Sequence, residues 1–221
     1  PSTPSKVRAM VAAGCTKILF CPLYPQYAGA TTATANDQFF RALMAEKWQP
    51  ASRTLPPYFA DPAYVDALAQ SVERAVGDTL PDVLVCSYHG LPFRYLTEGD
   101  PYHCQCQKTT RLLKERLGWA DTDIKTTFQS KFGPEEWLKP YTVEEVARLA
   151  RDEGKTRIAV IAPAFSADCI ETLEEINEEI RESFEEAGGE SFTYIPCLND
   201  TPDHVAALTA IIRENLGGWV S

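Results

Sequence analysis

One histidine stands where a turn follows an apolar run, in the segment Tyr88-His89-Gly90-Leu91-Pro92. Residues 83–86 before it are all apolar, and Gly90 and Pro92 favour a turn, so we expect His89 at the mouth of a sheet. Imidazole titrates near neutral pH, and its neutral form ligates metals. The pattern predicts a general base or metal ligand. A loop histidine held by a backbone hydrogen bond is an equally open interpretation.

A second group of reactive side chains follows the apolar run 158–162. Between residues 171 and 186 there are eight glutamates and one basic residue, Arg181. Glu171, Glu175 and Glu179 are spaced four residues apart, which places them near one face of a helix. Like charges at that spacing cost roughly 0.2–0.5 kcal/mol per pair. A row of carboxylates facing a cleft suits a hydrated divalent cation, because such ions prefer oxygen ligands.

Two structural interpretations of these acids stay open. Asp168 and Glu171 fit a capping box, with Asp168 as the N-cap and Glu171 at the third helical position. The remaining glutamates fit a solvated helix face, and acidic side chains favour helix N-termini. A capping role and a catalytic role for Glu171 are hard to combine, because a capping carboxylate turns back on its own backbone.

Aromatic residues follow other predicted strands. Trp137, Phe132 and Phe165 offer flat apolar surfaces near the same predicted sheet edge, where a planar aromatic ligand would fit. Core packing is the alternative for each. Tyr24 follows the first predicted strand and is placed to form the opposite lip of a cleft.

Apolar runs alternate with amphipathic stretches along the chain. The runs are apolar at consecutive positions, which is typical of parallel strands covered on both faces. Helices between them predict βαβ units and an α/β fold with doubly wound parallel sheets. The predicted strands are 17–23, 82–88, 124–129, 157–163 and 192–196, and the predicted helices are 34–45, 62–76, 105–117, 142–153, 168–187 and 202–216.

The Gly- and Pro-containing stretch 77–81 marks the best domain boundary. Residues 1–78 hold one convincing strand, too little for a closed domain, and are expected to be the later part of a first α/β domain. Residues 79–200 are expected to form a complete second one. Residues 201–221 would add a helix that packs on either domain, with a return to the first as one option.

Composition excludes several classes of protein. The formal net charge is −10, which disfavours nucleic acid as a partner because phosphate neutralisation needs clustered Lys and Arg. The chain has no apolar run of membrane-spanning length and begins without a secretory signal, so a cytoplasmic location is expected. Seven cysteines are then expected as free thiols. Cys104 and Cys106 form a CxC pair without a second pair to complete a four-thiolate site.

Taken together, four segments resemble the ferrochelatase family. They are Pro22-Leu23-Tyr24-Pro25-Gln26-Tyr27, Ser87-Tyr88-His89-Gly90-Leu91-Pro92, and the ranges 128–137 and 165–175. They occur in the family's order and with similar spacing, and the similarity runs over nearly the whole chain, most like proteobacterial members. The resemblance implies a chelatase-like fold of two Rossmann-like domains, the first incomplete here, with a porphyrin in the cleft between them.

The resemblance also implies site residues. The family's catalytic histidine falls on His89 and its glutamate on Glu171, and both are expected to contact the metal. The acidic row falls on Glu175 and Glu179, also as metal-handling groups, on a helix widened to a π turn. The family's pocket tryptophan falls on Trp137, and Tyr24 and Phe165 are expected to join it in binding the porphyrin. The implied partners are protoporphyrin IX and Fe²⁺ as substrates, and a transient membrane contact stays open.

The sequence departs from the family in three places. The N-terminal porphyrin-binding segment is missing, and Cys169 stands where animal members carry histidine. Gly29 replaces an animal iron–sulfur cluster ligand, and no cysteine follows Cys197. We therefore expect no iron–sulfur cluster.

Other functions stay open beside this one. The same chemistry with another metal or tetrapyrrole is one. A porphyrin or haem carrier without turnover is another, and it would not need the acidic row. A plain nucleotide-binding α/β protein is disfavoured, because no GxGxxG or GxxxxGK[ST] motif follows a predicted strand.

Overall fold

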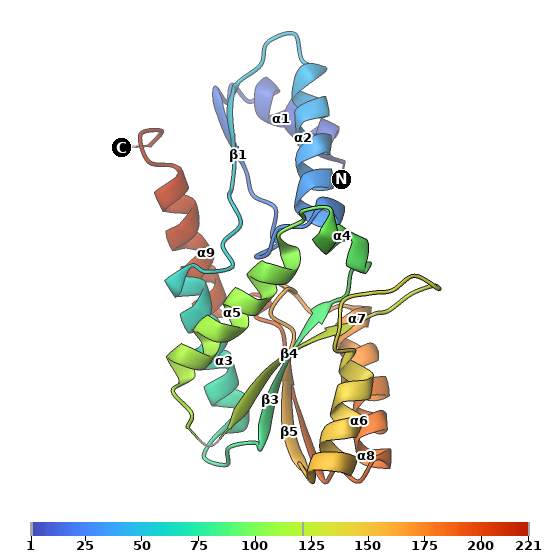
Figure 1. Cartoon of the computed structure of the whole chain (residues 1–221). Coiled ribbons are helices and arrows are strands. Elements are labelled where there is room, and N and C mark those ends of the chain that lie inside the picture. The colour runs from blue at the N-terminus through green and yellow to red at the C-terminus, as the bar shows by residue number, and fades with distance from the viewer. Residues whose placement is uncertain (1, 121, 221) are drawn as a thin grey trace.

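The computed structural model describes residues 2–120 and 122–220. Pro1, Asp121 and Ser221 lie outside the described residues. Each belongs to a different one of the predicted segments 1–78, 79–200 and 201–221. The molecule is elongated, with a small two-stranded sheet at one end and a four-stranded sheet at the other (Figure 1). Both sheets are parallel, as the sequence predicted.

The four-stranded sheet carries the main core. It contains β3 (Val83–His89), β4 (Asp123–Gln129), β5 (Arg157–Ile161) and β6 (Ser191–Ile195), in the spatial order β4-β3-β5-β6. Alternate residues of β3 enter different cores: Leu84 packs on one face of the sheet and Val83 on the other. This double burial explains why the strand is apolar at consecutive positions.

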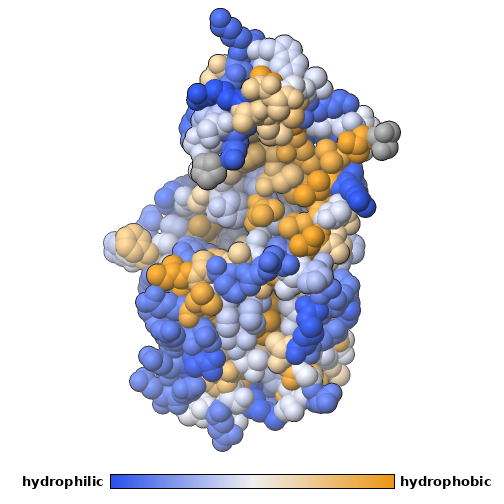
Figure 2. All heavy atoms as spheres, turned by 180° about the vertical axis from the view of Figure 1, so that it is seen from behind, coloured by the Kyte–Doolittle hydropathy of each residue, from blue (hydrophilic) through white to orange (hydrophobic). Residues whose placement is uncertain are grey.

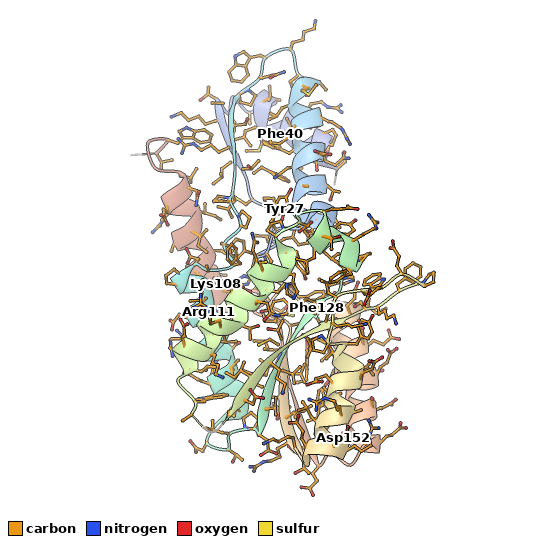
Figure 3. All side chains as sticks on the ribbon, viewed as in Figure 1. Tyr27, Phe40, Lys108, Arg111, Phe128 and Asp152 are labelled. Carbon is orange, nitrogen blue, oxygen red and sulfur yellow. The ribbon has the colours of Figure 1, made fainter. Side chains whose placement is uncertain are left out.

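Helices cover both faces of this sheet (Figure 1). One face packs against α3 (Pro62–Val76), α5 (Tyr102–Leu117) and α9 (Pro202–Asn215). The opposite face packs against α6 (Thr142–Glu153) and the helical segments after β5. The sheet is therefore doubly wound. In Figure 3, Phe128 lies near the carboxyl end of β4, and Asp152 lies at the far end of the sheet.

The two-stranded sheet is formed by β1 (Lys17–Phe20) and β2 (Ala51–Thr54) and is covered by α1 (Thr3–Ala12) and α2 (Thr34–Met44). Phe20 stacks on Phe39 of α2 with ring centroids 4.6 Å apart. This core is small, and Figure 2 shows apolar residues exposed across the same half of the molecule. A short π-helical segment, Gly29–Ala33, leads into α2.

The predicted domain boundary near residue 78 does not coincide with a gap in the core. The last helix before it, α3, shares one hydrophobic cluster with the four-stranded sheet and with α9. Beyond α9 the chain reaches the other sheet, where the Arg53 guanidinium lies 4.2 Å from the Trp219 ring centroid and binds the carbonyl oxygens of Asn215 and Gly217. The division into 1–78, 79–200 and 201–221 stays a prediction.

Most predicted elements are present, with differences at their ends. The predicted strand 157–163 ends at Ile161, and the predicted helix 168–187 is three segments: α7 (Ile170–Leu173), η2 (Glu175–Ile180) and α8 (Arg181–Glu186). The middle one is a π helix, as the family resemblance implied. The short helix α4 (Phe93–Thr97) follows β3. No helix in residues 2–120 and 122–220 is long and apolar enough to cross a membrane.

Candidate active site

The strand order places the candidate site where the direction of winding changes. From β3 the chain moves outward to β4, and β5 then lies on the other side of β3. Crevices beyond the carboxyl ends of strands at such a point are the usual ligand sites of open α/β sheets. His89 is the last residue of β3, and the segment after β5 leads into α7 with Glu171. His89 therefore ends one strand, and Glu171 lies on the helix that follows the neighbouring strand.

One ring nitrogen of His89 is hydrogen-bonded to the backbone. Its Nδ1 lies 2.6 Å from the Gly90 carbonyl oxygen, so Nδ1 carries a proton, and in the neutral ring Nε2 is then the acceptor. The Tyr102 hydroxyl donates to the His89 carbonyl oxygen at 2.9 Å. The half-buried imidazole lines a hollow of about 150 Å³ together with other residues: Tyr24, Gln26, Thr31, Tyr102, Ala164 and Phe165. Both interpretations left open for His89 are therefore compatible, because the backbone contact uses only one nitrogen.

Aromatic rings lie on either side of the turn after His89. The imidazole centroid is 6.4 Å from that of Trp137 and 6.5 Å from that of Phe165. A Cβ on Gly90 would come within 2.7 Å of the Gln129 carbonyl oxygen and 3.0 Å of the Trp137 ring, so only glycine fits. Trp137 is 8% exposed and packs beneath this turn. Tyr24 and Phe165 line the His89 hollow, whereas Trp137 does not.

The surroundings of Glu171 lower the pKa of its carboxyl group. Hydrogen bonds from the Cys169 thiol and from the backbone N–H of Glu171 itself lower the pKa of Glu171 below its ordinary value, and they outweigh the opposing effect of burial.

The capping-box interpretation of Asp168 and Glu171 is wrong. Cys169 is the N-cap of α7, and the Thr172 hydroxyl accepts a hydrogen bond from the Cys169 backbone N–H at 2.9 Å. Asp168 instead turns toward the end of β6, where the Asn199 amide donates to it at 2.7 Å. Glu171 is thus not the partner in a capping box, although its carboxylate does interact with its own backbone N–H.

Glu175 is tied to the end of β4. Its carboxylate accepts hydrogen bonds from the Ser130 backbone N–H and hydroxyl, each at 2.5 Å, and from Gln129 Nε2 at 3.0 Å. Glu175 and the exposed Glu179 line two adjoining hollows, of about 270 and 310 Å³. Glu171 lines only the first of these. The acidic row thus runs from the site toward solvent.

Gln129 is a site residue that the sequence did not reveal. Its side-chain Nε2 donates to the Glu171 carbonyl oxygen at 2.7 Å as well as to Glu175, and its Oε1 accepts from the buried Ser87 hydroxyl at 2.8 Å. Its own carbonyl accepts from the Gly90 N–H at 2.8 Å. The only signal was its position at the end of a predicted strand.

The four predicted metal-handling residues do not form a closed cage. Across residues 2–120 and 122–220, no three His, Cys, Asp or Glu side chains lie close enough to hold a metal ion together. His89 and Glu171 line separate hollows. Their role in contacting a metal therefore stays a prediction. All seven cysteines are free thiols, with Cys104 exposed and Cys106 buried.

The sequence matches the family model described as Ferrochelatase over residues 1–216. The chain belongs to the ferrochelatase family. Among curated relatives, it is 70% identical to the ferrochelatase of Rhodobacter capsulatus and 55% identical to that of Rhizobium meliloti, and both alignments cover the whole chain. The chain spans 63% and 65% of the length of these two ferrochelatases.

Solved structures support the fold that the ferrochelatase family implies. SirB from Bacillus subtilis with Fe³⁺ has a TM-score of 0.71 at 17% identity, covering 97% of this chain and 77% of SirB. DR2241 from Deinococcus radiodurans, described as structurally similar to chelatases, has a TM-score of 0.59 at 10% identity, covering 95% of this chain and 49% of that protein. At these identities the likeness concerns the fold alone, and it confirms the chelatase-like α/β architecture.

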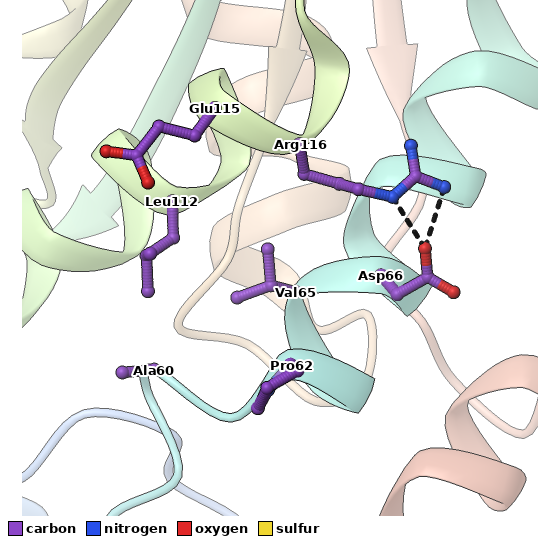
Figure 4. Close-up of a pocket in the computed structure, with 7 residues that line it drawn as sticks. All are labelled: Ala60, Pro62, Val65, Asp66, Leu112, Glu115 and Arg116. Carbon is purple, nitrogen blue, oxygen red and sulfur yellow. Dashed lines mark hydrogen bonds and ion pairs between the residues drawn. The ribbon is translucent and has the colours of Figure 1, made fainter.

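A further hollow lies away from these residues. It measures about 350 Å³ and sits between α3 and α5, lined by Ala60, Pro62, Val65, Asp66, Leu112, Glu115 and Arg116 (Figure 4). Arg116 is paired with Asp66 at 2.7 Å and with Glu73 at 3.2 Å. Glu115, which also lines it, pairs with Arg111 at 2.7 Å, so the charged groups of this hollow are already paired and it is not the candidate active site.

Proposed function

We propose that the protein is a ferrochelatase that inserts Fe²⁺ into protoporphyrin IX, with release of two protons, to form protohaem in the last step of haem biosynthesis. The observation that carries this proposal is the family match over residues 1–216, combined with His89 at the end of β3 and Glu171 on α7, the helix that follows the neighbouring strand β5. The proposal concerns the whole protein, of which this chain matches about two thirds of a relative's length.

The chemistry requires a base and a metal-binding group at the ring centre. Insertion removes two pyrrole N–H protons and delivers a desolvated Fe²⁺. His89 offers Nε2 as an acceptor in its neutral form, because its Nδ1 is bound to the Gly90 carbonyl. Glu171 is ionised at neutral pH, since its pKa is lowered mainly by the Cys169 thiol and its own backbone N–H. One of the two takes the pyrrole protons, and both contact the metal.

Ring distortion supplies the remaining part of the mechanism. Pyrrole nitrogens of a planar porphyrin are poorly exposed, so a cleft that bends the ring resembles the transition state more than the substrate. Tyr24 and Phe165 line the His89 hollow and would contact the ring directly. Trp137, packed beneath Gly90, would support the turn that carries His89.

The acidic row suits transport between the site and solvent. Glu175 and Glu179 border two adjoining hollows, and carboxylates are suitable groups for passing protons or hydrated metal. Glu179 is exposed and Glu175 half-buried. The row is the feature that a porphyrin carrier without turnover would not need.

The test is an absorbance assay of haem formation from Fe²⁺ and protoporphyrin IX with the purified full-length protein. His89→Ala and Glu171→Ala should each lower the rate by about 100-fold or more, while circular dichroism remains that of the folded protein. Glu182→Ala is the matched control, because Glu182 is exposed on the same helical stretch. Full activity in both site variants would refute the assignment.

Metal and porphyrin specificity needs a separate measurement. A panel of Fe²⁺, Co²⁺ and Ni²⁺ with protoporphyrin and coproporphyrin separates ferrochelatase from related chelatases. Porphyrin binding without any metal insertion would instead favour a carrier. The cytoplasmic location and a transient membrane contact stay predictions.

A further inference from the structure

The segment between β5 and α7, residues 162–169, is held in place by side chains rather than by a strand ladder. The Asp168 backbone N–H donates to Asn199 Oδ1 at 2.9 Å, and Asn199 Nδ2 donates to Asp168 Oδ2 at 2.7 Å. The Asn199 backbone N–H also donates to the Ser166 carbonyl at 3.0 Å. We call this reciprocal pair the Asp168–Asn199 clasp. It joins the loop that leads to Glu171 to the loop after β6.

The other carboxylate oxygen of Asp168 continues the connection into α7. It accepts hydrogen bonds from the Tyr194 hydroxyl, the Cys197 backbone N–H at 3.0 Å and the Thr172 hydroxyl at 3.2 Å. Thr172 completes the cap of α7, the helix that begins with Ile170 and Glu171. Asp168 therefore orients the first turn of the helix that presents Glu171.

Asp168 is suited to this role as an ionised group. Partial burial would raise the pKa of Asp168, but hydrogen bonds from Tyr194, Asn199 and Cys197 outweigh it and hold the pKa below its ordinary value. Charge-assisted hydrogen bonds of this kind are shorter and roughly twice as strong as neutral ones. Neither Asp168 nor Asn199 lines the hollows that contain His89 and Glu171.

The clasp also reaches the opposite lip of the candidate cleft. The Ser166 hydroxyl donates to the Leu23 carbonyl at 2.7 Å, next to Tyr24. Asn199 adopts φ +49°, a left-handed conformation that Asn tolerates better than most residues. Its carbonyl lies 2.6 Å from His204 Nδ1. Asn199 is thus fixed from α9 and in turn fixes residues 166–168.

We propose that the Asp168–Asn199 clasp is a positioning device that aims Glu171 at the metal. The inference rests on the proposed function, because it assigns Glu171 to the metal. Groups that orient a metal-binding side chain without touching the metal typically contribute 10–100-fold, as an order of magnitude, to metal affinity or activity. Asp168 and Asn199 are positioning residues in this sense.

The test compares Asp168→Asn with wild type in the full-length protein. An amide replaces the charged acceptor and places an N–H donor among donors from Tyr194, Cys197 and Asn199. We expect a roughly 10–100-fold rise in KM for Fe²⁺ and in Kd for Co²⁺ alone by calorimetry. The KM for porphyrin should stay within about two-fold, and Tyr194→Phe should give a smaller effect that is not additive with Asp168→Asn.

Asp203→Asn is the matched control, because Asp203 lies at the start of α9 and pairs with Arg74 instead. Unchanged metal constants in Asp168→Asn would overturn the inference. Parallel losses for metal and porphyrin, together with a lowered melting temperature, would assign a merely structural role and also overturn it. If wild type does not insert metal, the proposed function fails, and the Co²⁺ titration still decides whether the clasp orients a metal-binding group.

Discussion

Two hollows in this molecule differ in how their charged groups are used. The one between α3 and α5 is larger, about 350 Å³ against about 150 Å³ beside His89. Its guanidinium, Arg116, is bound by Asp66 and Glu73, whereas His89 keeps one ring nitrogen free of its backbone partner. The difference indicates that polar atoms without a protein partner, at the carboxyl ends of parallel strands, mark a candidate reactive site better than the size of a cavity does.

The largest expected contrast concerns activity. Glu171→Gln removes the charge that binds the cation and should lower metal insertion by about 100-fold or more. Arg116→Gln in the other hollow should leave insertion within about two-fold, because exposed ion pairs contribute little. Initial rates of haem formation for the two variants measure this contrast. Comparable losses in both would remove the distinction between the hollows.

The second contrast concerns positioning. Gln129→Ala removes donors to the Glu171 carbonyl and the Glu175 carboxylate and should lower insertion by roughly 10–100-fold. Gln70→Ala is the matched change, since Gln70 binds Asp66 at 2.6 Å on α3, and should leave the rate nearly unchanged. A Gln129→Ala protein with wild-type kcat and metal KM would show that Gln129 only fills space.

The third prediction concerns packing at the His89 turn. Gly90→Ala forces a Cβ to within 2.7 Å of the Gln129 carbonyl and should lower the free energy of unfolding by about 1–3 kcal/mol. Denaturant titration of the variant and the wild type measures the difference. An unchanged midpoint would mean that the turn relaxes easily, and that His89 is less firmly positioned than the contacts indicate.

The smallest change in stability is expected for a substitution in an ion pair that lies far from the candidate site. The hydrogen bond and charge of Arg148, helped by Lys125, hold the pKa of Glu145 below its ordinary 4.5 despite burial. This carboxylate therefore stabilises the fold above about pH 4.5, and its contribution disappears as pH falls through the lowered pKa. Glu145→Gln should cost roughly 0.3–1 kcal/mol at pH 7. In unfolding titrations the cost should shrink as pH falls through the lowered pKa of Glu145.

The sequence predicted those helices whose ends are marked by local residues such as an N-cap or a terminal glycine. The helices 62–76 and 142–153 have the predicted bounds, since Asp61 caps the first and glycines end both. The strand β2 was missed because Ala51–Thr54 is mostly exposed and polar, so no apolar run marks it. Helix α1 also lies outside the predicted set.

Site residues were predictable where a residue type is rare and not where a partner is distant. His89 stood out because the chain has three histidines and this one follows a predicted strand. Gln129 and Asp168 did not, because their partners lie 42 and 31 residues away. Local propensity favoured Asp168 as a helix cap, and the Tyr194 and Asn199 partners outcompete that role.

The helix α9 has a consequence for how the two ends of the molecule stay in register. Its body buries Ala207 and Ile211 beside α3. Carbonyl oxygens of its last residue and of the residues just after it accept hydrogen bonds from Arg53 and Lys17 of the small sheet. One inserted residue would rotate everything beyond it by about 100° around the axis. Helix α9 should therefore tolerate insertions only of about a whole turn, because other lengths would turn the residues after it away from Lys17 and Arg53. It acts as a spacer between the two sheets that can have only certain lengths.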